Sequence, residues 1–194
     1  MEKALYRSEL MAARQKAAKP MLWLAMASMA MIFAGLTSAY VVRAGNGNWL
    51  IFKMPATFLI STALITASSL TMLAASQKAK AGVFSGMAWY LFFTLVLGVA
   101  FTFCQLQAWA ELTATGIVFG GKYSNAAGSF LYALTGMHLF HLAGGLIAVL
   151  VTWIKSLGRK YSAGNTLGLE LCAMYWHFLT AVWLYLFLFL YFFR

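Results

Sequence analysis

The chain has 194 residues, of which 63% are hydrophobic and only 9% are charged, and its formal net charge is +10. Soluble domains carry about 25% charged residues, so this composition excludes an ordinary soluble protein. The basic residues are scattered between apolar runs instead of gathering on one face, which argues against a nucleic-acid-binding protein. The composition indicates a membrane protein with several spans.

The first segment, residues 1–19, is polar and charged. It has no short apolar core followed by a cleavage-like site, so we predict no signal peptide. It could form a short helix on the membrane surface or a solvated tail that helps to set the topology. We expect a cytoplasmic N-terminal tail here.

Five apolar runs follow, at about residues 20–42, 55–76, 84–110, 128–154 and 171–193. A helix rises 1.5 Å per residue and needs about 20 residues to cross a hydrocarbon core of about 30 Å, so every run is long enough. The connections between the runs are too short to hold a second domain. We therefore predict an all-α fold, a polytopic membrane bundle of five transmembrane helices over residues 20–194.

The basic residues divide unequally between the two sides of the predicted membrane. One side has ten of them, Lys3, Arg7, Arg14, Lys16, Lys19, Lys78, Lys80, Lys155, Arg159 and Lys160, and the other has Arg43, Lys53, Lys122 and Arg194. By the positive-inside rule the N-terminus lies inside and the C-terminus outside, which agrees with an odd number of spans.

Each run carries small or polar residues at helical spacing, which allow membrane helices to approach closely and to form hydrogen bonds. The predicted faces are Ala25, Ser28, Gly35 and Ala39; Thr62, Thr66, Ser69 and Ser76; Thr94, Gly98, Thr102, Gln105 and Trp109; Thr135, His138, His141, Gly145, Ala148 and Thr152; and Glu170, Ala173, His177 and Thr180. We expect these faces to meet inside the bundle, with Gly144 and Ala148 at a close helix contact.

Charged residues are absent from the middle of every span. Of the four acidic residues, Glu111 falls at the outer end of the third run and Glu170 at the inner start of the fifth. Ion-coupled transporters usually keep ionisable groups at mid-membrane, so the pattern argues against a transporter.

Three histidines lie within apolar runs. His138 and His141 share one helix face, about 4.5 Å apart along the axis, and His177 lies in the next run. No Asp, Glu or Cys accompanies them at that depth, which argues against a metal site. We expect neutral imidazoles hydrogen-bonded to facing Thr, Gln, Trp or backbone groups. A membrane b-haem or quinone anchor that uses His141 and His177 is the alternative.

The last seventy residues contain TGMHLFHLAGG, then Glu170, then YWHFLTAVWLYLFLFLYF, in which Trp176 and Trp183 lie deep enough for helix packing or lipid contact. This order resembles subunit III of the haem–copper respiratory oxidases, with its TGxHxxH helix, its Glu and its YWHFxDxxW helix. The segment from Gln105 to Trp109 and the segment from Phe33 to Arg43 resemble two further family motifs. The resemblance covers about residues 20–194 and matches the short, five-helix bacterial form.

Three carboxylates of the family pattern are replaced, by Met29, Ala108 and Thr180, although Glu111 is a family-like acid nearby. A role in proton handling that depends on those acids is therefore not implied for this chain.

The resemblance implies a non-catalytic subunit of a proton-pumping cytochrome c oxidase, which reduces oxygen to water in aerobic respiration, in a bacterial plasma membrane. Such a subunit packs on catalytic subunit I, with subunit II in the same complex, holds structural phospholipid in a cleft, and supports assembly and sustained turnover. Haem and copper are expected in the partner subunits and none in this chain. The structural polar or lipid-cleft candidates are His138, His141, Glu170, His177, Trp176, Gln105, Glu111 and Arg43. The corresponding subunit of a quinol oxidase or a nitric oxide reductase is the alternative within the family.

Overall fold

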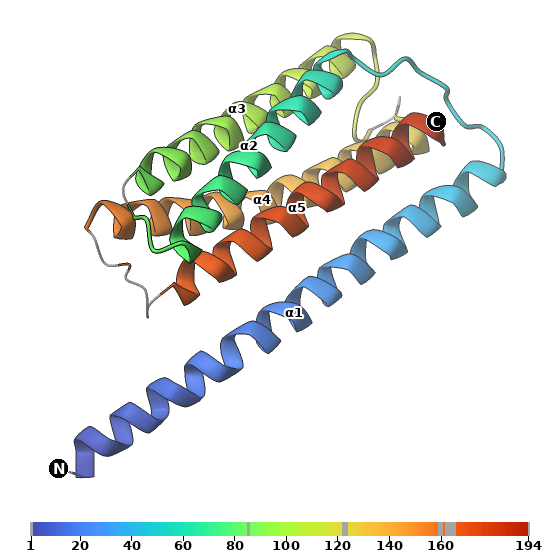
Figure 1. The fold of residues 1–194 in the computed structure, drawn as a ribbon. Helices are drawn as coiled ribbons and strands as arrows, with labels where there is room; N and C mark the ends of the chain where they lie inside the picture. The colour runs from blue at the N-terminus through green and yellow to red at the C-terminus, as the bar shows by residue number, and fades with distance from the viewer. Residues whose placement is uncertain (1, 85, 122–123, 159–160, 162–165, 194) are drawn as a thin grey trace.

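The computed structural model describes residues 2–84, 86–121, 124–158, 161 and 166–193, and within them the chain forms helices and no strand. The helices are α1 (Glu2–Gly45), α2 (Thr57–Lys80), α3 (Met87–Ala114), α4 (Ala126–Leu157) and α5 (Leu167–Phe192) (Figure 1). All five are long and apolar enough to cross a membrane. The prediction of an all-α fold with five helices able to span a membrane is confirmed, while the side on which each terminus lies stays a prediction.

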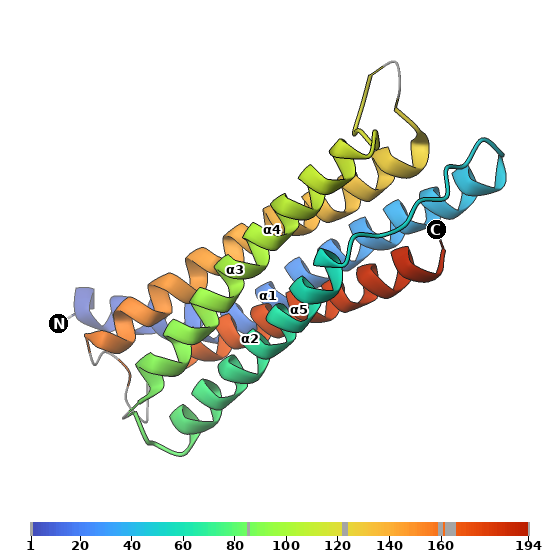
Figure 2. The same cartoon turned by 90° about the horizontal axis from the view of Figure 1, so that it is seen from above.

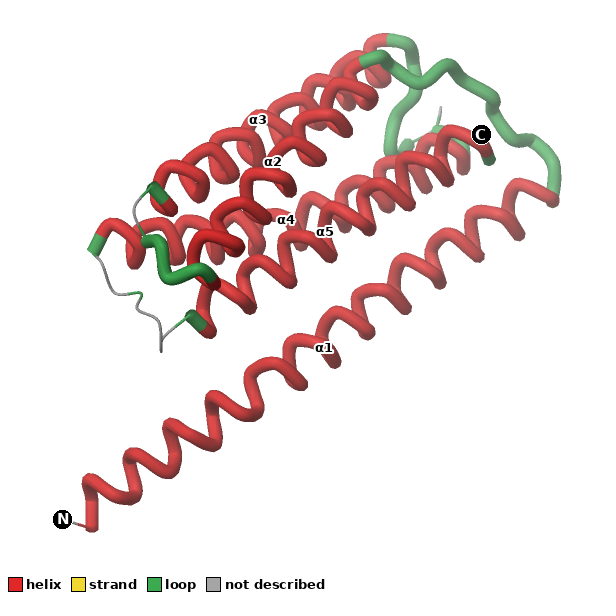
Figure 3. The backbone as a smooth tube through the Cα atoms, viewed as in Figure 1, coloured by secondary structure: helices red, strands yellow, loops and turns green. Residues whose placement is uncertain are grey.

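Four of the helices form the body of the bundle. α2 packs on α3 and α5, and α4 packs on α3 and α5, so α2 to α5 form a closed ring. In the described residues α1 packs only on α4 and α5, and Figure 1 shows it apart from α2 and α3, while in the view of Figure 2 it lies behind the other helices. The described parts of the connections are drawn in green in Figure 3 and lie at the two ends of the bundle. Long helices joined by short turns leave neighbouring helices antiparallel.

Helix α1 begins well before the first predicted span. It runs from Glu2 to Gly45 with Pro20 inside it. Proline has no N–H, so the helix loses one hydrogen bond there, but the chain continues as a helix on both sides. The boundary predicted between residues 19 and 20 is therefore not a break in the helix. That residues 1–19 lie on the cytoplasmic side stays a prediction.

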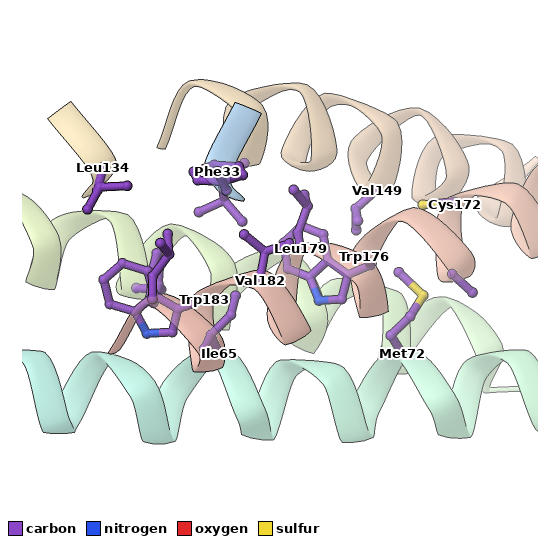
Figure 4. Close-up of a cluster of buried hydrophobic side chains, with 14 of the residues drawn as sticks. Phe33, Ile65, Met72, Leu134, Val149, Cys172, Trp176, Leu179, Val182 and Trp183 are labelled. Carbon is purple, nitrogen blue, oxygen red and sulfur yellow. The ribbon is translucent and has the colours of Figure 1, made fainter. Parts of the chain in front are cut away.

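The core lies between α2 and α5 and extends to α3 and α4. Trp176 and Trp183, the two largest side chains in it, have no solvent exposure, and Figure 4 shows them in one buried cluster with Ile65, Leu179 and Val182. Leu179, between them on α5, is also buried. Of the two roles expected for these tryptophans, helix packing and lipid contact, the structure shows helix packing.

The face that α1 turns to the bundle differs from the predicted one. Ser28 and Gly35 are exposed, as are Ala25 and Ala39, so the predicted stripe of small residues does not meet α4 or α5. The buried residues of α1 are instead Met26, Phe33, Thr37 and Tyr40. The prediction was wrong because the gap between α1 and the ring is filled by large side chains from α1 and does not require small ones.

Candidate functional site

Helix α2 carries a row of hydroxyl side chains that reach its neighbours, and we call this row the α2 seam. Its members are Thr57, Ser61, Thr62, Ser68, Ser69 and Thr71. Most of these hydroxyls donate to a backbone carbonyl of α2 itself, as Ser61 does to Phe58 O (2.9 Å) and Ser68 does to Ile65 O (2.7 Å). A hydroxyl has one donor and two acceptor positions, so each oxygen can still accept from another helix.

Towards α5, the α2 seam accepts from two tryptophans and pairs with a histidine. Trp183 Nε1 donates to Thr62 Oγ1 over 3.0 Å, and Trp176 Nε1 donates to Ser68 Oγ over 3.1 Å. His177 Nδ1 and Ser69 Oγ are 2.7 Å apart. His177 therefore has the hydrogen bond to a facing helix that the sequence predicted, although its partner is a serine and not one of the groups expected.

Towards α3, the α2 seam pairs with an amide, a carboxylate and a hydroxyl. Gln105 Nε2 donates to Ser61 Oγ over 2.7 Å, and Thr57 Oγ1 donates to Glu111 Oε1 over 2.8 Å. The hydroxyl groups of Thr71 and Thr94 form a hydrogen bond of 2.7 Å. The predicted candidates Gln105, Glu111, Trp176 and His177 thus all form hydrogen bonds with the α2 seam. These bonds fix α2 against α3 and α5.

Two glycines make room for the Trp176 ring. A Cβ on Gly98 would lie 2.7 Å from Trp176 Cη2, and a Cβ on Gly145 would lie 2.7 Å from Leu179 Cδ1 and 3.4 Å from Trp176 Cε3. The close contact predicted for Gly144 is in fact made by Gly145, because Gly144 is exposed. Trp176 therefore contacts α3 and α4 while it is bonded to α2.

His138 lies in an aromatic box. Its ring centroid is 5.1 Å from that of Trp183, 6.0 Å from Phe101 and 6.3 Å from Phe33. The side chain has no solvent exposure, and neither ring nitrogen has a hydrogen-bond partner among the described residues. The prediction that each buried imidazole is hydrogen-bonded was wrong here, because the facing groups are aromatic rings.

His141 has a local partner. Its Nδ1 lies 2.8 Å from Met137 O, one turn earlier on α4, and its own carbonyl accepts from the Tyr175 hydroxyl over 3.1 Å. His177 faces α2, so His141 and His177 have different neighbours. Within the described part of the chain, no group of three or more His, Cys, Asp and Glu side chains is placed to hold a metal ion.

Helix α1 is attached to the ring at two depths. Lys19 Nζ and Glu170 Oε2 form an ion pair at 2.7 Å, and Thr166 Oγ1 donates to Glu170 Oε1 over 2.9 Å. Further along, Thr37 Oγ1 and the Tyr185 hydroxyl are 2.9 Å apart. These contacts give Glu170 a role in holding α1 to the start of α5.

Arg43, the last candidate, stays local to the end of α1. Its Nη1 donates to Gly47 O over 3.0 Å, in the loop that follows. That loop is also held at Asn125, the N-cap of α4, which accepts from Ala127 N over 2.9 Å and donates from Nδ2 to Asn48 O over 3.1 Å. Arg43 is not part of the α2 seam.

The three positions that depart from the family pattern are placed differently. Ala108 has no exposure, and Thr180 is buried and donates to Trp176 O over 3.1 Å. A carboxylate at either position would be buried in this bundle, which is costly without a partner. Met29 is only half-buried on α1.

Sequence reasoning missed part of the α2 seam. It selected Thr62 and Ser69, whereas Thr57, Ser61, Ser68 and Thr71 also pair with other helices. The large number of Ser and Thr residues in α2 could have revealed them. Because these residues occupy adjacent positions, they cover a wider part of the helix circumference than a single stripe.

The family model described as Cytochrome c oxidase subunit III matches residues 50–194. A protein named Probable cytochrome c oxidase subunit 3 from Nocardia farcinica is 35% identical over 182 residues, which cover 89% of this chain and 85% of that protein. Cytochrome c oxidase subunit 3 of Bacillus sp. is 29% identical over 170 residues, covering 85% of this chain and 80% of the relative.

An animal relative is longer. Cytochrome c oxidase subunit 3 of Anopheles gambiae is 34% identical over 140 residues, which cover 72% of this chain but only 50% of the relative. The match of this chain thus spans about half the length of the mosquito protein, and most of the two bacterial ones.

Proposed function

Because the chain belongs to the cytochrome c oxidase subunit III family, we propose that it is the non-catalytic subunit III of a proton-pumping haem–copper terminal oxidase. It packs on the catalytic subunit I, in a complex that also holds subunit II, and it supports assembly and sustained turnover. The complex reduces oxygen to water in aerobic respiration and lies in a bacterial plasma membrane.

The observation that carries this proposal is how the bundle uses its polar side chains. Gln105, Trp176 and His177, all within the family motifs, form hydrogen bonds to α2. Hydrogen bonds between membrane helices fix their packing and register. Helix packing that is fixed in this way suits a subunit that presents a surface of constant shape to a partner.

Haem and copper belong to the partner subunits in this proposal. The different neighbours of His141 and His177 support it, because a bis-histidine haem needs both imidazoles on one iron. The aromatic rings around His138 also supply no further metal ligand.

Structural phospholipid is part of the proposed function. A groove of about 310 Å³ lies between α1 and α5, and it is lined by Ala30, Phe33, Ala34, Phe178, Ala181, Val182 and Tyr185. Its lining is almost entirely apolar, which suits a lipid acyl chain within the hydrocarbon core. The proposed topology, with the N-terminus inside, is supported by the ten basic residues on that side.

The test is a strain that lacks the chain. We expect its oxidase to assemble less well and to lose activity during sustained turnover, and the wild-type chain supplied from a plasmid should restore both properties. An oxidase whose amount and turnover lifetime are unchanged without the chain would refute the proposal.

A further inference from the structure

A second groove lies at the end of the bundle where α2 begins and α5 ends. It has a volume of about 400 Å³ and is lined by Lys53, Met54, Pro55, Ala56, Leu59, Phe187, Leu188, Tyr191 and Phe192. Ligand pockets in proteins commonly have roughly 300–1,000 Å³. The groove is separate from the one between α1 and α5, with which it shares no lining residue.

The second groove combines a mostly apolar lining with a single charged residue. Eight of its nine lining residues are apolar or aromatic, and Lys53 is the one charged residue among them. Lys53 is exposed, and the ion pair in the described part of the chain joins Lys19 to Glu170 instead. The first turn of α2 also has no acidic residue. Among the described residues Lys53 has no ion-pair partner, so the groove presents its positive charge beside an apolar channel.

The apolar part extends towards the membrane. Leu59 is 64% exposed and Phe192 is 73% exposed, so large apolar side chains on both helices are open to a neighbour. In a membrane, a molecule that fills this groove must place apolar groups beside α2 and α5. It must place a polar group at the level of the loop that precedes α2 and holds Lys53. A phospholipid has this distribution of polar and apolar groups.

We propose that the second groove binds an anionic phospholipid, with its phosphate against the Lys53 ammonium and an acyl chain along Leu59 and Leu188. This inference rests on the proposed function, since it assigns one position to a structural lipid of the oxidase subunit. A cation attracts an anionic headgroup over a zwitterionic one, because the net charge of the lipid then complements the protein. The lysine sets the headgroup class, and the apolar channel holds the chain.

The experiment uses the complete oxidase, purified in mild detergent from membranes that hold phosphatidylglycerol as the anionic lipid. Bound phospholipids are counted by mass spectrometry for the wild type and for Lys53→Met and Leu59→Trp. The first variant removes the charge and the second fills the channel. Lys155→Met, an exposed lysine at the opposite end of the bundle, and Leu70→Trp, at a residue that is 64% exposed as Leu59 is, are the matched controls.

We expect both groove variants to lose one phosphatidylglycerol per complex, while both controls keep the wild-type number. An unchanged count in Lys53→Met and Leu59→Trp overturns the inference, and so does the loss of a zwitterionic lipid in place of the anionic one. The ratio of this chain to subunit I is measured in the same samples. If the wild-type chain does not co-purify with subunit I, the proposed function fails; normal co-purification with an unchanged lipid count refutes only the groove.

Discussion

Trp176 on α5 donates its indole N–H to the hydroxyl oxygen of Ser68 on α2, over 3.1 Å, and both side chains have no solvent exposure. The same ring lies against Gly98 on α3 and Gly145 on α4. One side chain therefore touches every other helix of the four-helix ring. Since Trp176 belongs to the family motif YWHF, the motif's tryptophan has a clear structural task.

Ser68→Ala should lower the free energy of unfolding in detergent by about 1–3 kcal/mol, because the buried Trp176 N–H then lacks an acceptor. Thr66→Ala is the control on the same helix, since Thr66 is exposed and its hydroxyl donates only to Thr62 O. The control should change stability by less than about 0.5 kcal/mol. Equal effects of the two variants would show that the bond to Trp176 contributes nothing.

The two glycines beside Trp176 should differ in their tolerance of alanine. The Cβ of Gly98→Ala meets the rigid, hydrogen-bonded indole at 2.7 Å, so we expect a loss of about 1–3 kcal/mol from overpacking. The Cβ of Gly145→Ala meets the flexible end of Leu179, which can move, and the indole only at 3.4 Å. Alanine also stabilises a helix over glycine by about 1 kcal/mol, so Gly145→Ala should be close to neutral.

Thermal unfolding of the two glycine variants in one detergent measures this difference. A Gly145→Ala protein that is less stable than Gly98→Ala would contradict the placement of the Trp176 ring.

His138 should tolerate an aromatic ring better than a small side chain. His138→Ala leaves a cavity between Phe33, Phe101 and Trp183, and large-to-small core changes cost about 2–5 kcal/mol. His138→Phe keeps a ring and removes two buried nitrogens that have no partner, so we expect little loss or a gain. Stability in detergent and retention of the subunit in the complex are the measurements.

The haem spectrum of the complex serves as a second measurement on the His138 variants. It should be the same in both, since His138 belongs to no group of three or more potential metal ligands among the described residues. If His138→Phe is as damaging as His138→Ala, or if either variant loses haem, the imidazole has a polar role that the aromatic box does not explain.

The ion pair between Lys19 and Glu170 should tolerate reversal. Both side chains are partly exposed, at 48% and 30%, and such pairs contribute about 0–1 kcal/mol. Lys19→Glu alone places two carboxylates together and should loosen α1, which a cysteine cross-link between α1 and α5 can detect. Adding Glu170→Lys should restore the cross-link yield. A double variant with the yield of the single one would mean that the pair does not hold α1.

The sequence predicted the helices well because length and hydropathy decide them. The five runs correspond to the five helices, each of which extends beyond its run at one end at least, as α4 does from 128–154 to Ala126–Leu157. The prediction of helix faces was correct where a large neighbouring side chain leaves room only for a small residue. Gly98 and Gly145 are needed because Trp176 lies against both.

The same rule failed for α1 and for His138. Small residues allow close approach but do not require it, and nothing in the sequence shows that Phe33 and Tyr40 fill the space on this side. The partner of a buried imidazole depends on which side chains of other helices face it. His177 faces Ser69 and His138 faces rings, and helical periodicity cannot distinguish the two cases.

The most direct test of the account is purification of the tagged chain from its own membranes in mild detergent, followed by a count of its partner subunits and a haem spectrum. We predict equal amounts of this chain and a haem–copper subunit I, with the haem bound to the partner and its spectrum unchanged by His177→Ala. A chain that is purified without a haem–copper subunit, or that carries a haem of its own which His177→Ala removes, would contradict the assignment.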